Sequence, residues 1–434
     1  MSNENSGLQI SEDQRQSWLS LVAVWAGTMI CVPALMVGGM LTSGFTFGTT
    51  AVLVLLGYGL VILYMVFIGM ASADKGLPTV GLASHALGTA GSKYVVSVFI
   101  AIASIGWFGI QSYVCGAAFA SMIGQPNNVV LWTIIWGVVM LLTAVFGFKA
   151  LKYLNYVAVP CLVLLLGYAA YAAIFAEGAW DKIVNYAPPA ESAMPFLSGL
   201  TIVVGSFALG GVIAGDYTRY AKSRSDVIKG SILGVLPAAL IVMLIGGAST
   251  IATNQYDISL VFQELGVPAF GILALVLATW TTNVGNAYSG GIAIANILGG
   301  SEKAYQWSTG VAGALGTVLG AVGIMNNFSD FLSILSAIIP PVAGVIIAQY
   351  WLLDQGNPDK FREIVPVNWA GLISYIVGAA VAYITTYVLP FFLPAINGIV
   401  IAGVLYIILV KVIPPKSEDR EVVEIEVTET VVSD

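Results

Sequence analysis

Long apolar stretches, separated by short polar segments, follow one another along almost the whole chain. Each is long enough for a helix that crosses a bilayer, which needs about 20 apolar residues. The alternating pattern of an outer-membrane β-barrel is absent. The pattern therefore predicts an all-α polytopic membrane protein with about twelve transmembrane helices, near residues 17–41, 47–71, 95–123, 129–147, 152–176, 196–218, 228–252, 267–298, 305–325, 328–352, 367–389 and 391–413.

Composition supports this class. Hydrophobic residues make up 58% of the 434 residues and charged residues only 9%, whereas soluble proteins carry about 25% charged residues. Residues 1–16 are polar and lack the apolar core and cleavage pattern of a signal peptide. We therefore expect a cytoplasmic N-terminal segment (1–16), a transmembrane transporter domain (17–413) and an acidic cytoplasmic tail (414–434).

The positive charges predict the orientation in the membrane. With the N-terminus inside, all 16 lysines and arginines except Lys182 fall on the cytoplasmic side, as the positive-inside rule requires. We expect a multi-pass protein of the cell membrane with both termini in the cytoplasm. The net charge of −7 reflects exposed acids, and no nucleic-acid partner is expected.

Reactive groups are scarce. The three cysteines form no CxxC pattern and His85 is the single histidine, which excludes a Cys/His metal site. No serine-hydrolase, zinc-protease or P-loop motif occurs. We expect neither an enzyme nor a cofactor, but a pathway lined by neutral groups that suits a small, neutral, planar solute better than an ion. The carboxylates expected at span ends or in loops are Asp74, Asp216, Glu264, Asp330 and Asp354.

Two spans that lie five apart contain helix-breaking residues. The first, "VWAGTMICVPALMVGGML" (24–41), has Pro33 and a double glycine, and the sixth, "VVGSFALGGVIAGDYTRY" (203–220), has four glycines. Broken helices five spans apart are typical of inverted repeats with a substrate site at the membrane midplane. We predict a five-plus-five inverted repeat, with repeat one near 17–176, repeat two near 196–352 and two peripheral helices near 367–413.

The third span carries a candidate receptor for a flat ring. Trp107 and Gln111 are four residues apart and share one helix face. An aromatic ring stacks on a heterocycle, and a carboxamide recognises ring N–H and C=O groups. Gly106 and Gly109 are expected to clear space beside the Trp107 ring.

The eighth span holds four polar groups within six residues. The hydroxyls of Thr281 and Thr282 and the carbonyl of Ala278 are candidates for half of a sodium cage, completed by span one between Thr28 and Cys31. The carboxamides of Asn283 and Asn286 are candidates for substrate contacts. Helix-to-helix hydrogen bonds are the alternative role for these side chains.

These segments resemble the nucleobase:cation symporter-1 family of purine/cytosine permeases and hydantoin transporters. The similarity spans residues 17–413, and the chain looks most like the bacterial cytosine permeases. It rests on "GWFG" (106–109), "VVGSF" (203–207), "ATWTTN" (278–283) and "FLSILSAIIPPVAGVIIAQYWL" (331–352). The resemblance implies ten core helices of the LeuT-like fold, two peripheral helices, and a substrate between spans one, three, six and eight.

The resemblance also implies roles for single residues. Trp107 matches the family's stacking tryptophan, Phe207 the opposing aromatic, and Gln111 the glutamine of hydantoin transporters. Asn286 is the better match to the substrate-binding asparagine, with Asn283 the alternative. The residues that match the family's sodium ligands are Ala278, Thr281 and Thr282, with Thr28 and Cys31 near the carbonyls of span one.

Several positions depart from the cytosine permeases. The family members that carry cytosine have glutamine in place of Ser104, serine in place of Leu209, asparagine in place of Ala278 and an acid in place of Val284. Each lost polar contact costs about 1–3 kcal/mol if a substrate group stays unpaired. A small planar nucleobase-like solute therefore remains the expectation, while cytosine itself is less well supported.

The expected function is secondary active import of a nucleobase or related heterocycle, driven by a sodium gradient. The substrate would lie between Trp107 and Phe207 and contact Gln111, Ser104, Ser206 and one of the two asparagines. Alternatives are an amino-acid or other small-solute symporter of the same fold, a proton-coupled nucleobase, hydantoin or allantoin permease, a channel for neutral solutes, and a non-transporting sensor.

Overall fold

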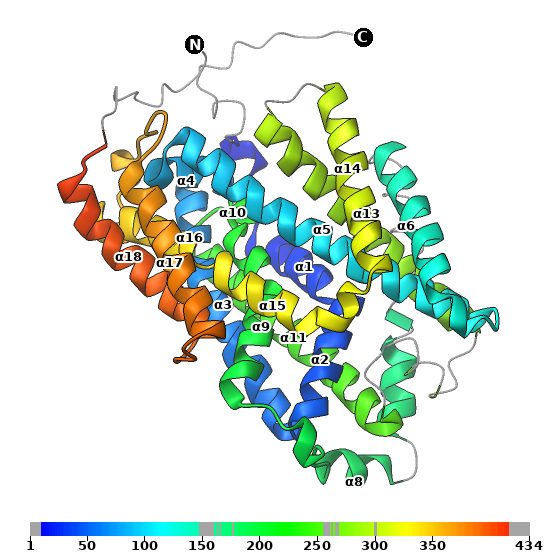
Figure 1. The fold of residues 1–434 in the computed structure, drawn as a ribbon. Coiled ribbons are helices and arrows are strands. Elements are labelled where there is room, and N and C mark those ends of the chain that lie inside the picture. The colour runs from blue at the N-terminus through cyan, green and yellow to red at the C-terminus, as the bar shows by residue number, and fades with distance from the viewer. Residues whose placement is uncertain are drawn as a thin grey trace.

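The computed structural model describes residues 10–146, 160–175 except 162 and 165, 178–254, 261, 264, 269–298 and 302–415. These residues are folded almost entirely into helices, joined by short turns (Figure 1). The first half contains α1 (Trp18–Met29), α2 (Val32–Gly44), α3 (Phe47–Lys75), α4 (Thr79–Leu87), α5 (Thr89–Met122), α6 (Val129–Phe146) and α8 (Ala179–Val184). The second half contains α9 (Phe196–Val212), α10 (Gly215–Thr218), α11 (Arg224–Thr253), α13 (Ala269–Leu298), α14 (Glu302–Ala321), α15 (Phe328–Ile338), α16 (Pro341–Ile347), the π-helical η5 (Ala348–Leu353), α17 (Trp369–Tyr387) and α18 (Pro394–Val412).

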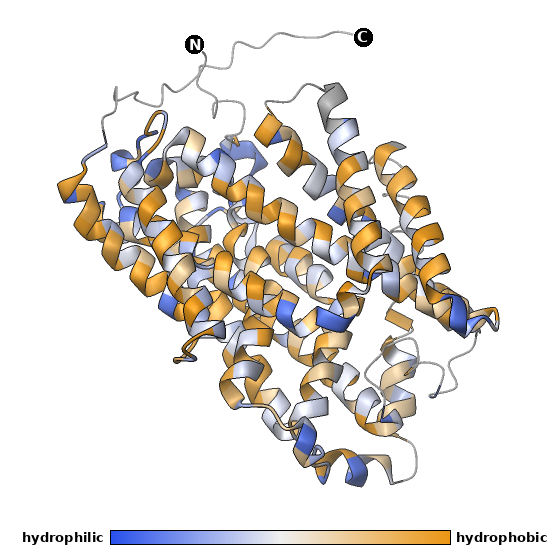
Figure 2. Cartoon of the chain, viewed as in Figure 1, coloured by the Kyte–Doolittle hydropathy of each residue, from blue (hydrophilic) through white to orange (hydrophobic). Residues whose placement is uncertain are grey.

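Eight helices within the described residues are long and apolar enough to cross a membrane, and the α1–α2 pair makes a ninth if it counts as one bent span. The predicted segments 267–298 and 305–325 form helices α13 and α14 but do not belong to this set. The predicted segment 152–176 is described only in part, and the number twelve stays a prediction. Figure 2 shows mostly hydrophobic residues along the outer helices α6 and α18. Only 22% of the 18-residue apolar stretch of α18 is buried, against 72% of that of α5. Helix α5 is therefore central and α18 peripheral.

Both predicted breaks are present. The α1 and α2 axes differ by 60°, and the chain between them is extended at Cys31, with φ −145° and ψ 157°. Pro33 follows in the first turn of α2, where its missing N–H costs no helical hydrogen bond. In the sixth span, Phe207 has non-helical angles (φ −129°, ψ 16°), and α9 ends before α10 begins.

The glycines near these breaks serve close packing and do not themselves form the breaks. A methyl group on Gly38 would overlap the backbone carbonyl of Met243 in α11, and one on Gly205 would overlap that of Leu332 in α15. The break in span one lies between Met29 and Val32, within the segment around Thr28 to Cys31 where the sequence predicted unwound backbone. Bare backbone at Gly38 lets α2 approach α11 closely, as small residues do between membrane helices.

The helix contacts follow the symmetry of an inverted repeat. The α1–α2 pair packs on α11, and in the matching way α9 and α10 pack on α3. At the centre α5 packs on α13, while α6 contacts α13 and α14 contacts α5. Exchanging the first four spans of one half for the first four of the other thus reproduces the same pairs. The helices α17 and α18 pack on each other and on α15 and α16, outside this arrangement.

Charged side chains gather at one end of the bundle. Arg224 at the start of α11 forms a bidentate ion pair with Asp74 near the end of α3, with N–O distances of 2.7–3.0 Å. Arg15 donates to the carbonyls of Ala73 (2.6 Å) and Ala221 (2.9 Å). This is the end that the positive charges assign to the cytoplasm, and α8 lies at the opposite end (Figure 1).

Candidate functional site

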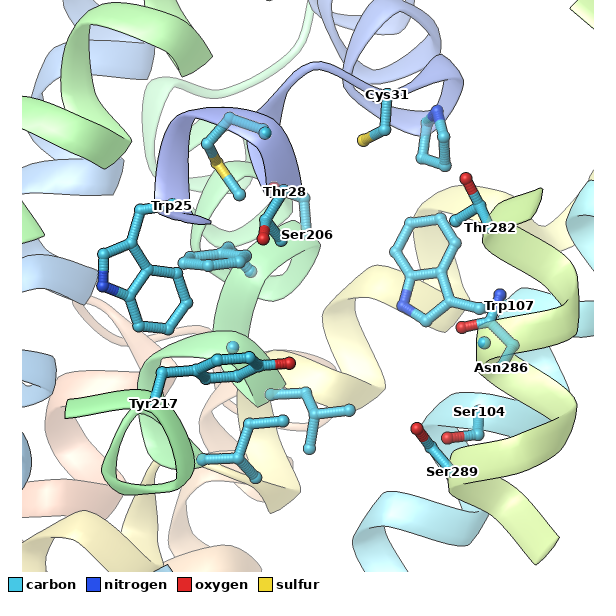
Figure 3. Close-up of a pocket in the computed structure, with 18 of the residues that line it drawn as sticks. Trp25, Thr28, Cys31, Ser104, Trp107, Ser206, Tyr217, Thr282, Asn286 and Ser289 are labelled. Carbon is cyan, nitrogen blue, oxygen red and sulfur yellow. The ribbon is translucent and has the colours of Figure 1, made fainter. Parts of the chain in front are cut away.

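A cavity of about 900 Å³ lies at the two helix breaks, between α1–α2, α5, α9–α10 and α13 (Figure 3). Its volume is within the range of small-molecule sites. The structure brings together on its wall eleven of the residues singled out from the sequence: Thr28, Cys31, Ser104, Trp107, Gln111, Ser206, Phe207, Ala278, Thr281, Thr282 and Asn286.

Along α5, three cavity-lining residues form one stripe. Ser104, Trp107 and Gln111 are spaced i, i+3 and i+7, so helical geometry alone places them on one face. The edge-on rings of Phe328 and Phe331, with centroids 5.9 and 5.5 Å away, fix the Trp107 ring. The ring is half-buried and lines the cavity, which suits it to stack on a planar ligand.

The glycines beside Trp107 do not create the expected space for a ligand. The position of a Cβ on Gly106 is occupied by the ring of Phe331. A Cβ on Gly109 would lie 2.8 Å from the carbonyl oxygen of Gly316 in α14. That expectation was wrong, because both glycines admit neighbouring helices and not the substrate.

Gln111 is the most unusual polar group in the cavity wall. Its side chain is 1% exposed, and neither its Nε2 nor its Oε1 has a hydrogen-bond partner in the described part of the chain. A buried polar group without a partner costs about 1–3 kcal/mol. Such groups are rare in native proteins, and Gln111 is among the residues that line the cavity.

On α13, three oxygens are gathered by local helix geometry. The hydroxyls of Thr281 and Thr282 both donate to the carbonyl oxygen of Ala278, at 2.9 and 3.0 Å. All three residues line the cavity, and Cys31 of the break in span one lies at the same end as Thr282 in Figure 3. The hydroxyl of Thr28 donates to the carbonyl of Val24, 2.9 Å away in its own helix. This set of neutral oxygens fits a hard monovalent cation, which binds hydroxyls and the carbonyls of broken helices.

Asn283 does not line the cavity and is fully buried between helices. Its Nδ2 donates to the carbonyl of Phe108 and to the hydroxyl of Ser112, both at 3.0 Å, which ties α13 to α5. Its Oδ1 accepts from Nδ2 of Asn286 at 3.3 Å. Of the two asparagines, Asn286 lines the cavity, and Asn283 lies behind it and bonds to it.

The wall across from Trp107 is aromatic. Phe207 packs against Tyr58 (5.9 Å between centroids, 29° between planes) and edge-on against Trp25 (6.1 Å). The adjacent hydroxyl of Ser206 donates to the carbonyl of Val203 at 2.7 Å. Figure 3 shows Trp25 with Tyr217 facing Trp107 across the cavity. Sequence reasoning missed Trp25, although it lies one turn before the break in span one.

One carboxylate also lines the cavity. Asp216, expected at a span end or in a loop, lies in α10 at the end of the sixth span and accepts a hydrogen bond from the backbone N–H of Thr79 at 2.8 Å. Thr79 opens α4, so the carboxylate caps the N-terminus of that helix. The expectation of a pathway lined only by neutral groups was wrong, because α10, which follows the break in span six and carries Asp216, also lines the cavity.

The cavity extends towards the charged end of the bundle. Its lining reaches Ala23 in α1, Ser97 near the start of α5 and Asn296 near the end of α13. These segments all belong to the half of the bundle that contains Arg15 and the Asp74–Arg224 pair. Thr28 is correspondingly solvent-exposed.

Comparisons with known proteins agree with this geometry. A family model for permeases for cytosine/purines, uracil, thiamine and allantoin matches residues 9–404. The cytosine permease of Escherichia coli (strain K12) is 30% identical over 415 residues, which cover 94% of this chain and 95% of the relative. The hydantoin permease of Microbacterium maritypicum is 24% identical, covering 84% and 81%.

Solved structures show the same fold. The inward-facing conformation of Mhp1 matches with a TM-score of 0.81 at 22% identity, covering 96% of each chain. Mhp1, a nucleobase-cation-symport-1 transporter, in a closed conformation with bromovinylhydantoin bound matches with a TM-score of 0.75, covering 96% and 98%. The protein therefore has the predicted LeuT-like fold and is a multi-pass membrane permease, not an enzyme. The chain belongs to the family of permeases for cytosine/purines, uracil, thiamine and allantoin, which its motifs predicted.

Proposed function

We propose that the protein imports a neutral, planar nucleobase-type heterocycle together with a cation, and that this cation is sodium. The observation that carries the proposal is the buried, unpartnered carboxamide of Gln111 next to Trp107 in the cavity wall. A ring that stacks on Trp107 presents its edge to Gln111, where one C=O and one N–H satisfy the amide. The family relationship supports this substrate class.

Sodium is favoured by the oxygens of Ala278, Thr281 and Thr282. The two hydroxyls donate to the carbonyl, and a cation bound there would draw all three oxygens towards itself. Binding there would couple α13 to the break in span one, since α13 also contacts α2. Such coupling requires that cation and substrate both favour the occluded state.

Proton coupling is the second candidate, supported by one observation. Asp216 supplies a titratable carboxylate in the cavity wall, and carboxylates inside membrane spans are a common feature of proton relays. We propose that the protein lies in the cell membrane with its charged end in the cytoplasm. In that orientation the cavity described above is open to the inside, the state from which substrate is released.

The test is uptake by purified protein in liposomes. Radiolabelled cytosine, uracil, hypoxanthine and hydantoin are offered under an imposed sodium gradient, a proton gradient, or neither. Accumulation that follows the sodium gradient supports the proposal, and accumulation that follows only the proton gradient replaces sodium by protons. No accumulation or binding of any of these heterocycles by folded protein would contradict the proposed function.

A further inference from the structure

The helices α5 and α13 run antiparallel and face each other as a ladder. Asn283 bonds to the carbonyl of Phe108, whereas a Cβ on Gly290, farther along α13, would lie 3.2 Å from Cβ of Ser104, which precedes Phe108 in α5. The stripe of Ser104, Trp107 and Gln111 therefore lies opposite the α13 residues spaced i, i+4 and i+7, which are Thr282, Asn286 and Ser289. Figure 3 shows two of the resulting rungs, Trp107 beside Asn286 and Ser104 beside Ser289.

The hydroxyls of Ser104 and Ser289 differ from those of Ser112 and Thr279 in the same two helices. In an apolar membrane helix, serine and threonine usually donate to a backbone carbonyl three or four residues earlier. Ser112 in α5 and Thr279 in α13 do so, at 2.8 and 2.9 Å. Within the described residues, the hydroxyls of Ser104 and Ser289 make no such bond. Ser104 is 3% exposed and both residues line the cavity, so both hydroxyls are left for a ligand.

We propose that Ser104 and Ser289 are specificity-determining residues that bind a polar group on the edge of the substrate opposite the one that Gln111 contacts. This inference rests on the proposed function and narrows it. The substrate has hydrogen-bonding groups on two opposite edges of one planar ring system, separated by the face that stacks on Trp107. Ser289 is not among the residues singled out from the sequence.

The chemistry of the rung sets its selectivity. A hydroxyl both donates and accepts, so two facing hydroxyls accommodate either a carbonyl or an amino group at that edge. The site should therefore tolerate an exchange of these two groups, as between uracil and cytosine. It should discriminate against a ring that lacks any polar group there, because both hydroxyls then stay unpaired.

The experiment compares ligand pairs that differ by one exocyclic group: uracil with 2-pyrimidinone, and hypoxanthine with purine. Binding to purified protein is measured for wild type, Ser104→Ala, Ser289→Ala and the double variant. For the pair that binds wild type, the double variant should lose roughly tenfold in affinity for the more substituted ring. It should keep its affinity for the ring without the group, so that the preference between the two collapses.

Ser97→Ala is the matched control, because Ser97 is a cavity-lining serine two turns from Ser104 on the same face of α5. It should change neither affinity. Equal losses for both rings of a pair, or an unchanged preference in the double variant, would overturn the role of Ser104 and Ser289 while leaving the proposed function standing. Failure of wild type to bind any of the four rings would instead contradict the proposed function.

Discussion

Replacing Gln111 by methionine should make the empty protein more stable and its substrate binding weaker. Methionine keeps the length and the unbranched shape of glutamine but removes the two polar atoms, Nε2 and Oε1, that have no partner in the described structure. The side chain is 1% exposed, so bulk water does not compensate for the missing hydrogen bonds.

The expected magnitudes follow from burial of the amide. An unsatisfied buried polar group destabilises the fold by about 1–3 kcal/mol. Its removal should therefore raise the free energy of unfolding of the substrate-free protein by a similar amount. A bound ring supplies the missing partners, so the same substitution removes up to about 1–3 kcal/mol from binding, roughly a 5- to 150-fold loss of affinity. Stability and affinity therefore move in opposite directions.

The assay pairs thermal unfolding of the purified protein, with and without substrate, with a binding measurement. Gln349→Met is the matched control, because Gln349 donates to Asp354 at 2.8 Å and accepts from the hydroxyl of Tyr406 at 2.6 Å. Loss of that satisfied amide should lower the unfolding temperature. If Gln111→Met also lowers it and leaves affinity unchanged, Gln111 is a structural residue and the reasoning is refuted.

Three further outcomes are expected. Thr282→Ala should raise the sodium concentration for half-maximal uptake, because one of three clustered oxygens is lost; an unchanged sodium dependence would place the cation elsewhere. Trp107→Ala should abolish uptake without reducing the amount of protein in the membrane, and normal uptake would exclude stacking on this ring. Asn286→Ala should weaken substrate binding with little loss of thermal stability, whereas Asn283→Ala should lower stability by about 1–3 kcal/mol, since Asn283 joins α13 to α5. Equal effects of the last two on both measurements would contradict their assignment to different faces.

The stripes of the candidate site could be predicted because they depend on local geometry. Residues three or four apart lie on one face of a helix whatever surrounds it, which is why Trp107 and Gln111 line the cavity together. The same holds for the hydroxyls of Thr281 and Thr282, which reach the carbonyl of Ala278 within their own helix.

The rotation of a helix against its neighbours could not be predicted in this way. Asn283 and Asn286 are equally polar in the sequence, yet the first contacts α5 and the second the cavity. Gly106 accommodates Phe331, which lies more than 200 residues away in the chain. Such pairings depend on which surfaces of distant helices pack together.

The sequence by itself determined the membrane class, most of the helices and the two broken spans, because hydrophobic length and proline or glycine content act within a single segment. The tertiary structure alone decided which polar groups face the cavity. It brought Asp216, Trp25 and Ser289 to that wall and left Gln111 without a partner. The physical reason is that the role of a polar side chain in a membrane protein depends on which hydrogen-bond partner it meets. Those partners come from distant segments of the chain.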